Sequence, residues 1–109
     1  MPHIVVEYSA DLSFDLPEML RQMHVKLGAE DSVDIKRIKT RAIPLKDTIV
    51  GDKGAAAHMV HIAIKLMPRP KDVAKRMASD LQALVRTHVP AGCAVTAEVV
   101  TLDPDTYCA

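Results

Sequence analysis

Residues 1–8 read MPHIVVEY, with a proline directly after the initiator methionine and an apolar, β-branched run behind it. The composition of residues 3–9 predicts a buried strand. Residues 61–66, HIAIKL, resemble residues 3–8, HIVVEY, and belong to a second strand-like run over 58–67. This second run is apolar on both faces, as expected of a central strand. We therefore predict one domain over 1–109 with a pseudo-repeat of residues 2–44 and 58–102.

Two segments carry the spacing of amphipathic helices. Apolar residues recur every three or four positions over 16–27, with Asp15 as the expected N-cap and Glu18 completing a capping box. Gly28 is a natural stop for this helix. A second apolar stripe predicts a helix over about 71–89. Both helices should therefore lie with one face against a sheet.

The remaining strands are expected over 33–43 and 95–102. In the first of them, a bend near Lys36 separates two patterns that are out of phase. Strand alternation then places three basic side chains on one face: Arg37, Lys39 and Arg41. The tail over 103–109 is expected to be mobile.

The order strand, helix, strand therefore occurs twice along the chain. Two right-handed βαβ crossovers would form one four-stranded sheet with both helices on the same face. We thus predict the α+β class. The opposite face of the sheet would remain partly apolar, and oligomerisation is the expected way to cover it.

The composition excludes several classes of function. The 14 basic and 14 acidic residues balance, which argues against nucleic-acid and membrane partners. Only three residues are aromatic, too few for the stacking platforms that bind single strands. Cys93 and Cys108 form no metal spacing, and reduced thiols in a cytoplasmic protein are expected. No apolar run approaches the length of a membrane span.

Pro2 is the candidate catalytic residue. Removal of Met1 would leave a free secondary amine at the start of a buried strand. An ordinary α-amino group titrates near roughly 7.7–8.0, and both burial and nearby cations disfavour its protonated form. Such an amine would be a general base with a pKa near the working pH. If Met1 is retained, the Pro2 nitrogen belongs to an amide and cannot act as a base.

At its N-terminus the chain resembles the 5-carboxymethyl-2-hydroxymuconate isomerases, members of the tautomerase superfamily with an N-terminal proline. The most specific match is the opening block, residues 2–9. Weaker matches follow in the family's order: residues 38–41 (Ile-Lys-Thr-Arg), 60–62 with Lys65, Arg69, and 86–88. The family has an arginine where this chain has the first basic residue of 38–41.

The resemblance implies a homotrimer with inward-facing sheets, active sites near subunit boundaries and a reaction without cofactor. In it, the proline nitrogen moves a proton between a dienol oxygen and a distant carbon of an unsaturated dicarboxylate-type acid. A small anionic substrate of this kind needs cationic partners. The candidates are Arg41, Lys39, Arg37 and Arg69. Arg41 ranks above Lys39, because a guanidinium binds carboxylate through a planar fork.

Two other interpretations remain open. A cluster of basic side chains on a strand is also typical of a solvated sheet edge. The protein would then be a non-catalytic trimeric α+β module that binds a small molecule, as expected if Met1 is retained. A tautomerase of another specificity is a further alternative. No zinc spacing occurs in the sequence, and His61 is expected to be a hydrogen-bonded core residue.

Overall fold

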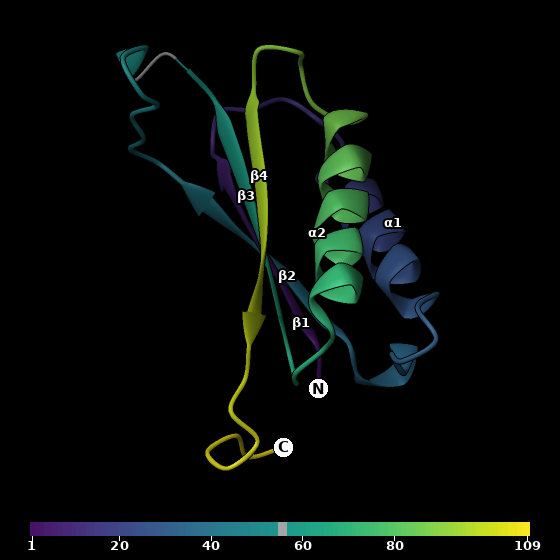
Figure 1. Ribbon diagram of the computed structural model, residues 1–109. Coiled ribbons are helices and arrows are strands. Elements are labelled where there is room, and N and C mark those ends of the chain that lie inside the picture. Colours follow the sequence, from purple (N-terminus) through teal and green to yellow (C-terminus); the bar gives the residue numbers. More distant parts are fainter. Residues whose placement is uncertain (55–56) are drawn as a thin grey trace.

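The computed structural model describes residues 1–54 and 57–109, and Ala55 and Ala56 lie outside the described residues. Figure 1 shows a sheet covered on one side by two helices. In chain order the elements are β1 (His3–Ser9), α1 (Leu16–Gly28), the 3₁₀ helix η1 (Ile35–Arg37), β2 (Lys39–Leu45), β3 (Met59–Leu66), α2 (Lys71–Arg86) and β4 (Ala94–Thr101).

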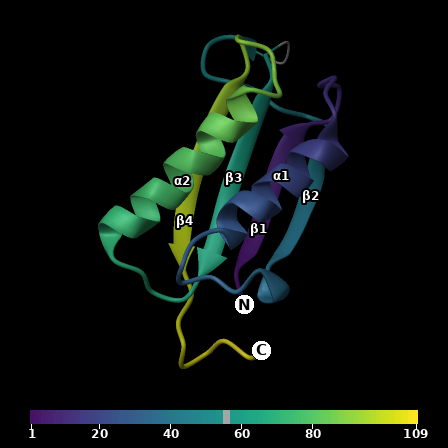
Figure 2. The same ribbon diagram turned by 90° about the vertical axis from the view of Figure 1, so that its right-hand side faces the viewer.

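The four strands form one mixed sheet in the order β2-β1-β3-β4. β1 runs parallel to β2, β3 runs parallel to β4, and the two central strands β1 and β3 are antiparallel. Each parallel pair is joined through one helix, and both helices cover the same face (Figures 1 and 2). The predicted α+β class and the two βαβ units are confirmed.

The core lies between this face and the helices. Alternate residues of the central strands point into it and have no exposed surface: Ile4, Val6, Val60, Ile62 and Ile64. They pack against buried helix residues that include Met19, Met23, Met77 and Leu81. Full burial of such a side chain contributes about 1.5–3 kcal/mol. Aliphatic and methionine side chains therefore supply the core.

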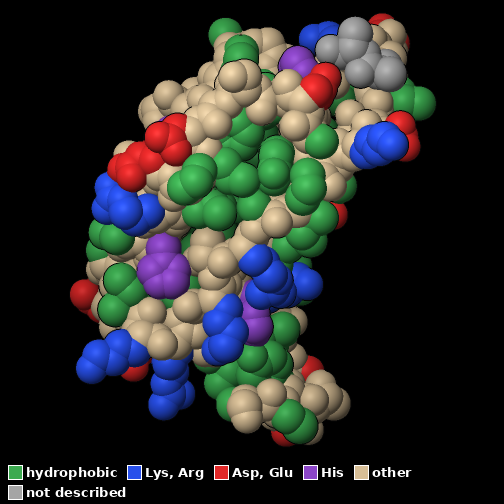
Figure 3. Space-filling view, turned by 180° about the vertical axis from the view of Figure 1, so that it is seen from behind, with side chains coloured by type: hydrophobic (Ala, Val, Ile, Leu, Met, Phe, Trp, Pro, Cys, Tyr) green, Lys and Arg blue, Asp and Glu red, His purple; other side chains and the backbone are tan. Residues whose placement is uncertain are grey.

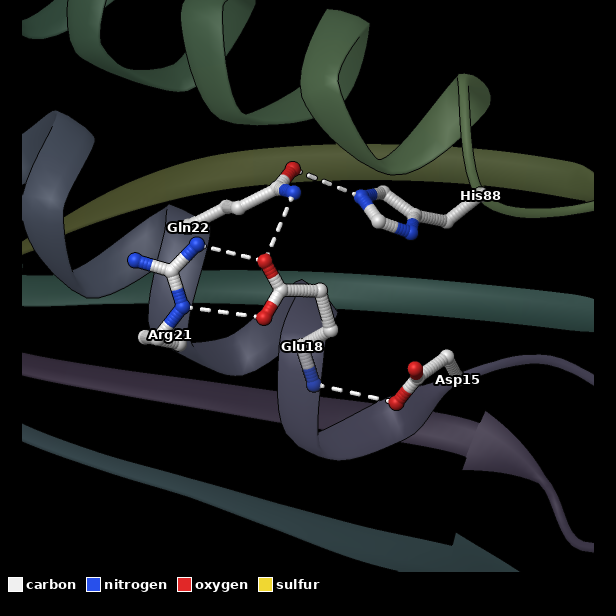
Figure 4. A network of polar contacts seen from close by, with 5 residues as sticks. All are labelled: Asp15, Glu18, Arg21, Gln22 and His88. Atoms are coloured by element: carbon white, nitrogen blue, oxygen red, sulfur yellow. Dashed lines mark hydrogen bonds and ion pairs between the residues drawn. The ribbon is translucent and has the colours of Figure 1, made fainter.

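Figure 4 shows how α1 begins and how its N-terminal turn joins the end of α2. The backbone N–H of Glu18 donates to Asp15 Oδ1 at 3.2 Å, so Asp15 is the N-cap as predicted. Glu18 does not reach back to complete the capping box. Its carboxylate accepts from Arg21 and Gln22, which lower its pKa to about 2. The amide of Gln22 also bonds His88 Nε2 at 2.8 Å.

The prediction of a strand over 33–43 is wrong in its first half. Residues 35–37 form η1, and the Asp34 side chain accepts from the N–H of Lys36 at 3.0 Å. This local side-chain bond to the backbone competes with strand pairing. β2 begins at Lys39 and continues through Pro44, which an edge strand tolerates because the missing N–H breaks no ladder bond.

Gly28 belongs to α1 and does not stop it through a left-handed conformation. Glycine is needed here because there is no space for a side chain: a Cβ at this position would lie 2.7 Å from side-chain atoms of Ile35. Gly28 thus lets η1 approach the end of α1. The second helix, predicted over about 71–89, ends earlier than expected, at Arg86.

The tail beyond β4 has defined contacts, whereas the sequence predicted a mobile segment. The N–H groups of Thr106 and Tyr107 both donate to the carbonyl of Asp103, which closes a turn. The Tyr107 hydroxyl lies 2.8 Å from His3 Nε2 at the start of β1. The tail therefore returns to the N-terminal end of the chain.

Candidate active site

A cavity of about 260 Å³ lies at the start of the chain. Its walls come from Pro2 with Met1, from the segment 32–37, from the end of β3, and from Arg69. Three connections meet here: the entry to β1, the η1 segment before β2, and the turn from β3 to α2. The cavity thus lies at one edge of the fold, where segments distant in sequence come together.

Pro2 is buried, and its position is fixed by the parallel pairing of β1 and β2. The Pro2 carbonyl accepts from the N–H of Lys39 at 2.9 Å. One residue earlier, the Met1 ammonium donates to the carbonyl of Arg37 at 2.8 Å. Hydrogen bonds to β2 and η1 therefore hold the first two residues against the cavity.

The charges around the chain start disfavour a protonated amine. Burial lowers the pKa of the Met1 amine below its ordinary value, and the positive charges of Lys39 and Arg37 lower it further. Asp34 acts in the opposite direction. The sequence analysis did not single out Asp34, since an N-cap acid of a 3₁₀ turn carries no catalytic signal.

Arg37 and Arg69 both line this cavity, but they are held differently. Arg37 is exposed, and its Nε lies 3.9 Å from Asp34 Oδ2, a loose ion pair. Arg69 is a clamp between two segments. It donates from Nε to Ser32 Oγ at 3.0 Å, from Nη2 to the Ser32 carbonyl at 2.9 Å, and from Nη1 to the Met67 carbonyl at 2.9 Å. Most of its donors therefore support the cavity wall.

Lys39 and Arg41 lie on β2 and point to the face of the sheet without helices. Lys39 pairs with His3 of β1 across the ladder. Arg41 donates from Nη1 to His3 Nδ1 at 3.0 Å. The predicted shared face is thus correct for these two residues and wrong for Arg37, which belongs to η1. The four candidate cations form two groups, one at the cavity and one on the open face.

His3 connects the open-face group to the tail. Burial lowers its pKa, and Arg41 and Lys39 add to the effect, so the ring is neutral at pH 7. Its edge meets Tyr107 in a T-shaped arrangement with ring centroids 6.0 Å apart. Figure 3 shows Lys and Arg side chains gathered beside a histidine. Sequence reasoning missed Tyr107, because no periodicity or motif marks it.

His61 belongs to the same open face, farther along the sheet. Its Nδ1 lies 2.7 Å from Thr96 Oγ1, and its Nε2 meets Glu98 Oε2 at 2.5 Å. The prediction that His61 is hydrogen-bonded is confirmed, but its expected place in the core is wrong, because the side chain lies on the open face and is 25% exposed. Among residues 1–54 and 57–109, no cluster of three or more His, Cys, Asp or Glu is placed to bind a metal ion.

The chain matches the family described as 5-carboxymethyl-2-hydroxymuconate isomerase (CHMI) over residues 2–104. It belongs to this family. The match covers both βαβ units and every site residue predicted from the sequence, so the predicted family is confirmed. Membership indicates tautomerase or isomerase activity. No curated protein matches the chain closely enough to add a second line of comparison.

Solved structures agree with this assignment at the level of the fold. A 5-carboxymethyl-2-hydroxymuconate isomerase from Deinococcus radiodurans R1 superposes with a TM-score of 0.86 at 24% identity, covering 99% of this chain and 87% of that one. A 5-carboxymethyl-2-hydroxymuconate delta-isomerase gives 0.81 at 16%, covering 100% and 87%. A fused 4-OT protein, described as a wild-type symmetric trimer, gives 0.80 at 14%, covering 94% and 88%. The CHMI-family chain therefore has a tautomerase-like fold.

In the part of the chain that the structure describes, neither helix has both the length and the apolar character that crossing a bilayer requires.

Proposed function

We propose that this protein is a proline-based tautomerase. It interconverts enol and keto forms of a small unsaturated acid such as 5-carboxymethyl-2-hydroxymuconate. The Pro2 amine, freed by removal of Met1, is the general base, and the reaction needs no cofactor. The observation that carries the proposal is the setting of the chain start: a buried proline beside a cavity, where burial lowers the pKa of the terminal amine and Lys39 and Arg37 lower it further.

Without Met1, the terminal amine moves one residue inward, to the buried Pro2. The same burial and the same cations then act on a secondary amine, whose neutral form carries the lone pair that a base needs. This amine takes the proton from the dienol hydroxyl, and the resulting ammonium returns it to a distant carbon of the conjugated chain. One proton moves and no electron is gained or lost, so the products balance.

The cations supply the remaining requirements. Negative charge spreads over the enolate oxygen as the proton leaves, and fixed positive charge stabilises it. Arg37 lies at the cavity, and among residues 1–54 and 57–109 its guanidinium is engaged only by a loose ion pair with Asp34. We assign it to the reacting end of the substrate. Arg41 and Lys39 bind carboxylate on the neighbouring face, whereas Arg69 serves chiefly to hold the cavity wall.

The decisive experiment replaces the base. Pro2→Ala should lower kcat/KM for 2-hydroxymuconate-type dienols by about 10²–10⁴-fold, the usual contribution of a general base. Ultraviolet absorbance follows the enol-to-keto conversion, and mass spectrometry first confirms that Met1 is absent. Pro17→Ala is the matched control, because Pro17 lies in the first turn of α1, away from the cavity. Full activity in Pro2→Ala would exclude the mechanism.

We also propose a homotrimer whose sheets face inward. The open face carries apolar side chains among its charges, and Ile43 remains 43% exposed there. A fold relative is described as a symmetric trimer. Sedimentation equilibrium should therefore give three times the mass of the chain, and a monomer at micromolar concentration would contradict the proposal.

One observation favours the alternative of a non-catalytic binding module. The Met1 ammonium has a specific acceptor, the Arg37 carbonyl at 2.8 Å, so an unprocessed terminus fits against the cavity. In such a protein the Pro2 nitrogen is an amide. An intact Met1 in the native protein, together with binding of a small acid but no turnover, would support this function.

A further inference from the structure

The open face of the sheet holds a group of positive charges that nothing in the described chain neutralises. Lys39 and Lys65 are the cross-strand neighbours of His3 on its two sides, and Arg41 donates to the His3 ring. None of these three cations forms an ion pair with an acid among residues 1–54 and 57–109. Only Arg41 contacts the ring, and the Lys39 ammonium donates to the Arg37 carbonyl at 3.5 Å. The charges of Arg41, Lys39 and Lys65 all act on His3, so an anion placed there would be attracted by all three.

The hydrogen bonds of His3 fix which way the Tyr107 hydroxyl donates. A guanidinium is only a donor, so Nδ1 of the neutral ring must accept from Arg41. The ring proton then resides on Nε2 and is donated to the Tyr107 oxygen at 2.8 Å. The hydroxyl hydrogen of Tyr107 is left for another acceptor, and no side chain or carbonyl of the described residues takes it.

We propose that Tyr107 is a substrate-binding residue that completes a carboxylate-binding site with Arg41, Lys39 and Lys65. The relay from Arg41 through His3 holds the phenol ring in place, and the free O–H donates to a carboxylate oxygen seated between the cations. The carboxylate belongs to the acid substrate, so the inference rests on the proposed function. The C-terminal tail thereby takes part in recognition, through one hydroxyl.

The site lies beside the proposed base, although on the other face of β1. Burial is the largest cause of the lowered pKa of both His3 and the terminal amine, and the charge of Lys39 lowers both further. The charge of the terminal amine also lowers the pKa of His3. A carboxylate bound at His3 would also offset the positive charge that accumulates when the amine takes a proton. The site is therefore suited to an acid whose carboxylate binds near His3 while its reacting carbons reach the amine.

The test separates the hydroxyl from the ring. Tyr107→Phe keeps the aromatic contact with His3 and removes only the O–H. Loss of one charge-assisted hydrogen bond should weaken glutarate, a saturated dicarboxylate probe, by about 10- to 100-fold in calorimetry. KM for the dienol should rise by a similar factor while kcat changes little. Tyr8→Phe is the control, because Tyr8 packs against Phe14 near the other end of β1.

A second variant tests the relay. His3→Phe removes the link between Arg41 and Tyr107, and it should weaken glutarate about as much as Tyr107→Phe does. The double variant should bind glutarate no more weakly than the poorer single variant, because coupled groups are non-additive. Glutarate bound by Tyr107→Phe with wild-type affinity would overturn the inference. The glutarate assay needs no turnover, so an active Pro2→Ala enzyme would refute the proposed base without deciding the role of Tyr107.

Discussion

The two faces of the sheet are built from alternate residues of the same strands, yet they have different characters. Towards the helices, Ile4 and Val6 of β1 and Ile62 of β3 are fully buried. On the opposite face, the intervening positions hold polar groups such as His3 and His61, which bond to other strands or to the tail. The helix face holds the fold together, whereas the open face carries the polar and charged side chains of the candidate site.

The comparison shows how strongly the candidate site depends on strand register. A slip of one residue turns every side chain of a strand to the other face. His3 would then lie in the core, and Ile4 would lie among the cations. The buried isoleucines and valines thus fix the register, and the register places Lys39 and Lys65 on either side of His3. Packing of the core on the helix face thus determines where the cations lie on the open face.

The largest expected difference between the two faces is in unfolding free energy. It can be measured by truncating one isoleucine on each face. Ile62→Ala deletes a fully buried side chain and should lower the free energy of unfolding by about 2–5 kcal/mol, through lost burial and a residual cavity. Ile43→Ala removes the same atoms from the open face, where Ile43 is 43% exposed. In a monomer it should cost no more than about 0.5 kcal/mol.

Denaturant titration at several protein concentrations measures both variants. If the open face is a subunit interface, the cost of Ile43→Ala should grow with protein concentration, because assembly stabilises only the parent chain. Equal costs for the two variants in a monomer would contradict the division between the faces.

A smaller effect concerns the cavity at the sheet edge. Arg69→Lys keeps the charge but loses the planar fork that bonds Ser32 and the Met67 carbonyl. We expect a loss of about 1–3 kcal/mol in unfolding free energy, because backbone carbonyls lose their partner. The KM for the dienol should change less than it does in Arg41→Lys. A stable Arg69→Lys protein with a strongly raised KM would instead make Arg69 a substrate ligand.

Much of this architecture could be predicted from local patterns. The apolar, β-branched runs of β1 and β3 and the apolar stripes of both helices identified the elements. The expectation that β3 is apolar on both faces was wrong, because its partly exposed positions include His61 and Lys65. The start of β2 could not be found this way. Asp34 caps a 3₁₀ turn, and this bond between neighbouring residues outweighs the strand-like pattern of Val33 and Ile35. The pseudo-repeat of residues 2–44 and 58–102 stays a prediction.

The candidate site could be predicted only at residues whose type and place in the sequence suggest a chemical role. Pro2 after Met1 and the basic residues of 37–41 attracted notice for that reason. Tyr107 and Ser32 did not, because their roles depend on which distant segment the chain brings beside them: His3 lies 104 positions from Tyr107. The sequence identified Arg69 as a cation. Its bonds to the backbone carbonyls of Ser32 and Met67 could not be predicted, because they form only where the segment before β2 lies beside the turn after β3.

The smallest expected effect concerns the charge next to the base. Lys39 is one of the cations that lower the pKa of the terminal amine, so Lys39→Met should raise that pKa. Since the neutral amine is the proposed base, the acid limb of kcat/KM should move to higher pH, with activity lost near neutrality and recovered in alkali.

Lys46→Met is the matched control, because Lys46 is exposed just beyond the end of β2. NMR titration of the amine gives the pKa directly, in the Met1-bearing and the Met1-free protein. A shift in both forms would mean that Lys39 acts through its charge on whichever amine occupies the chain start. If only kcat/KM changes and the pKa does not, Lys39 acts as a carboxylate ligand, and the open face influences the base solely through the substrate it holds.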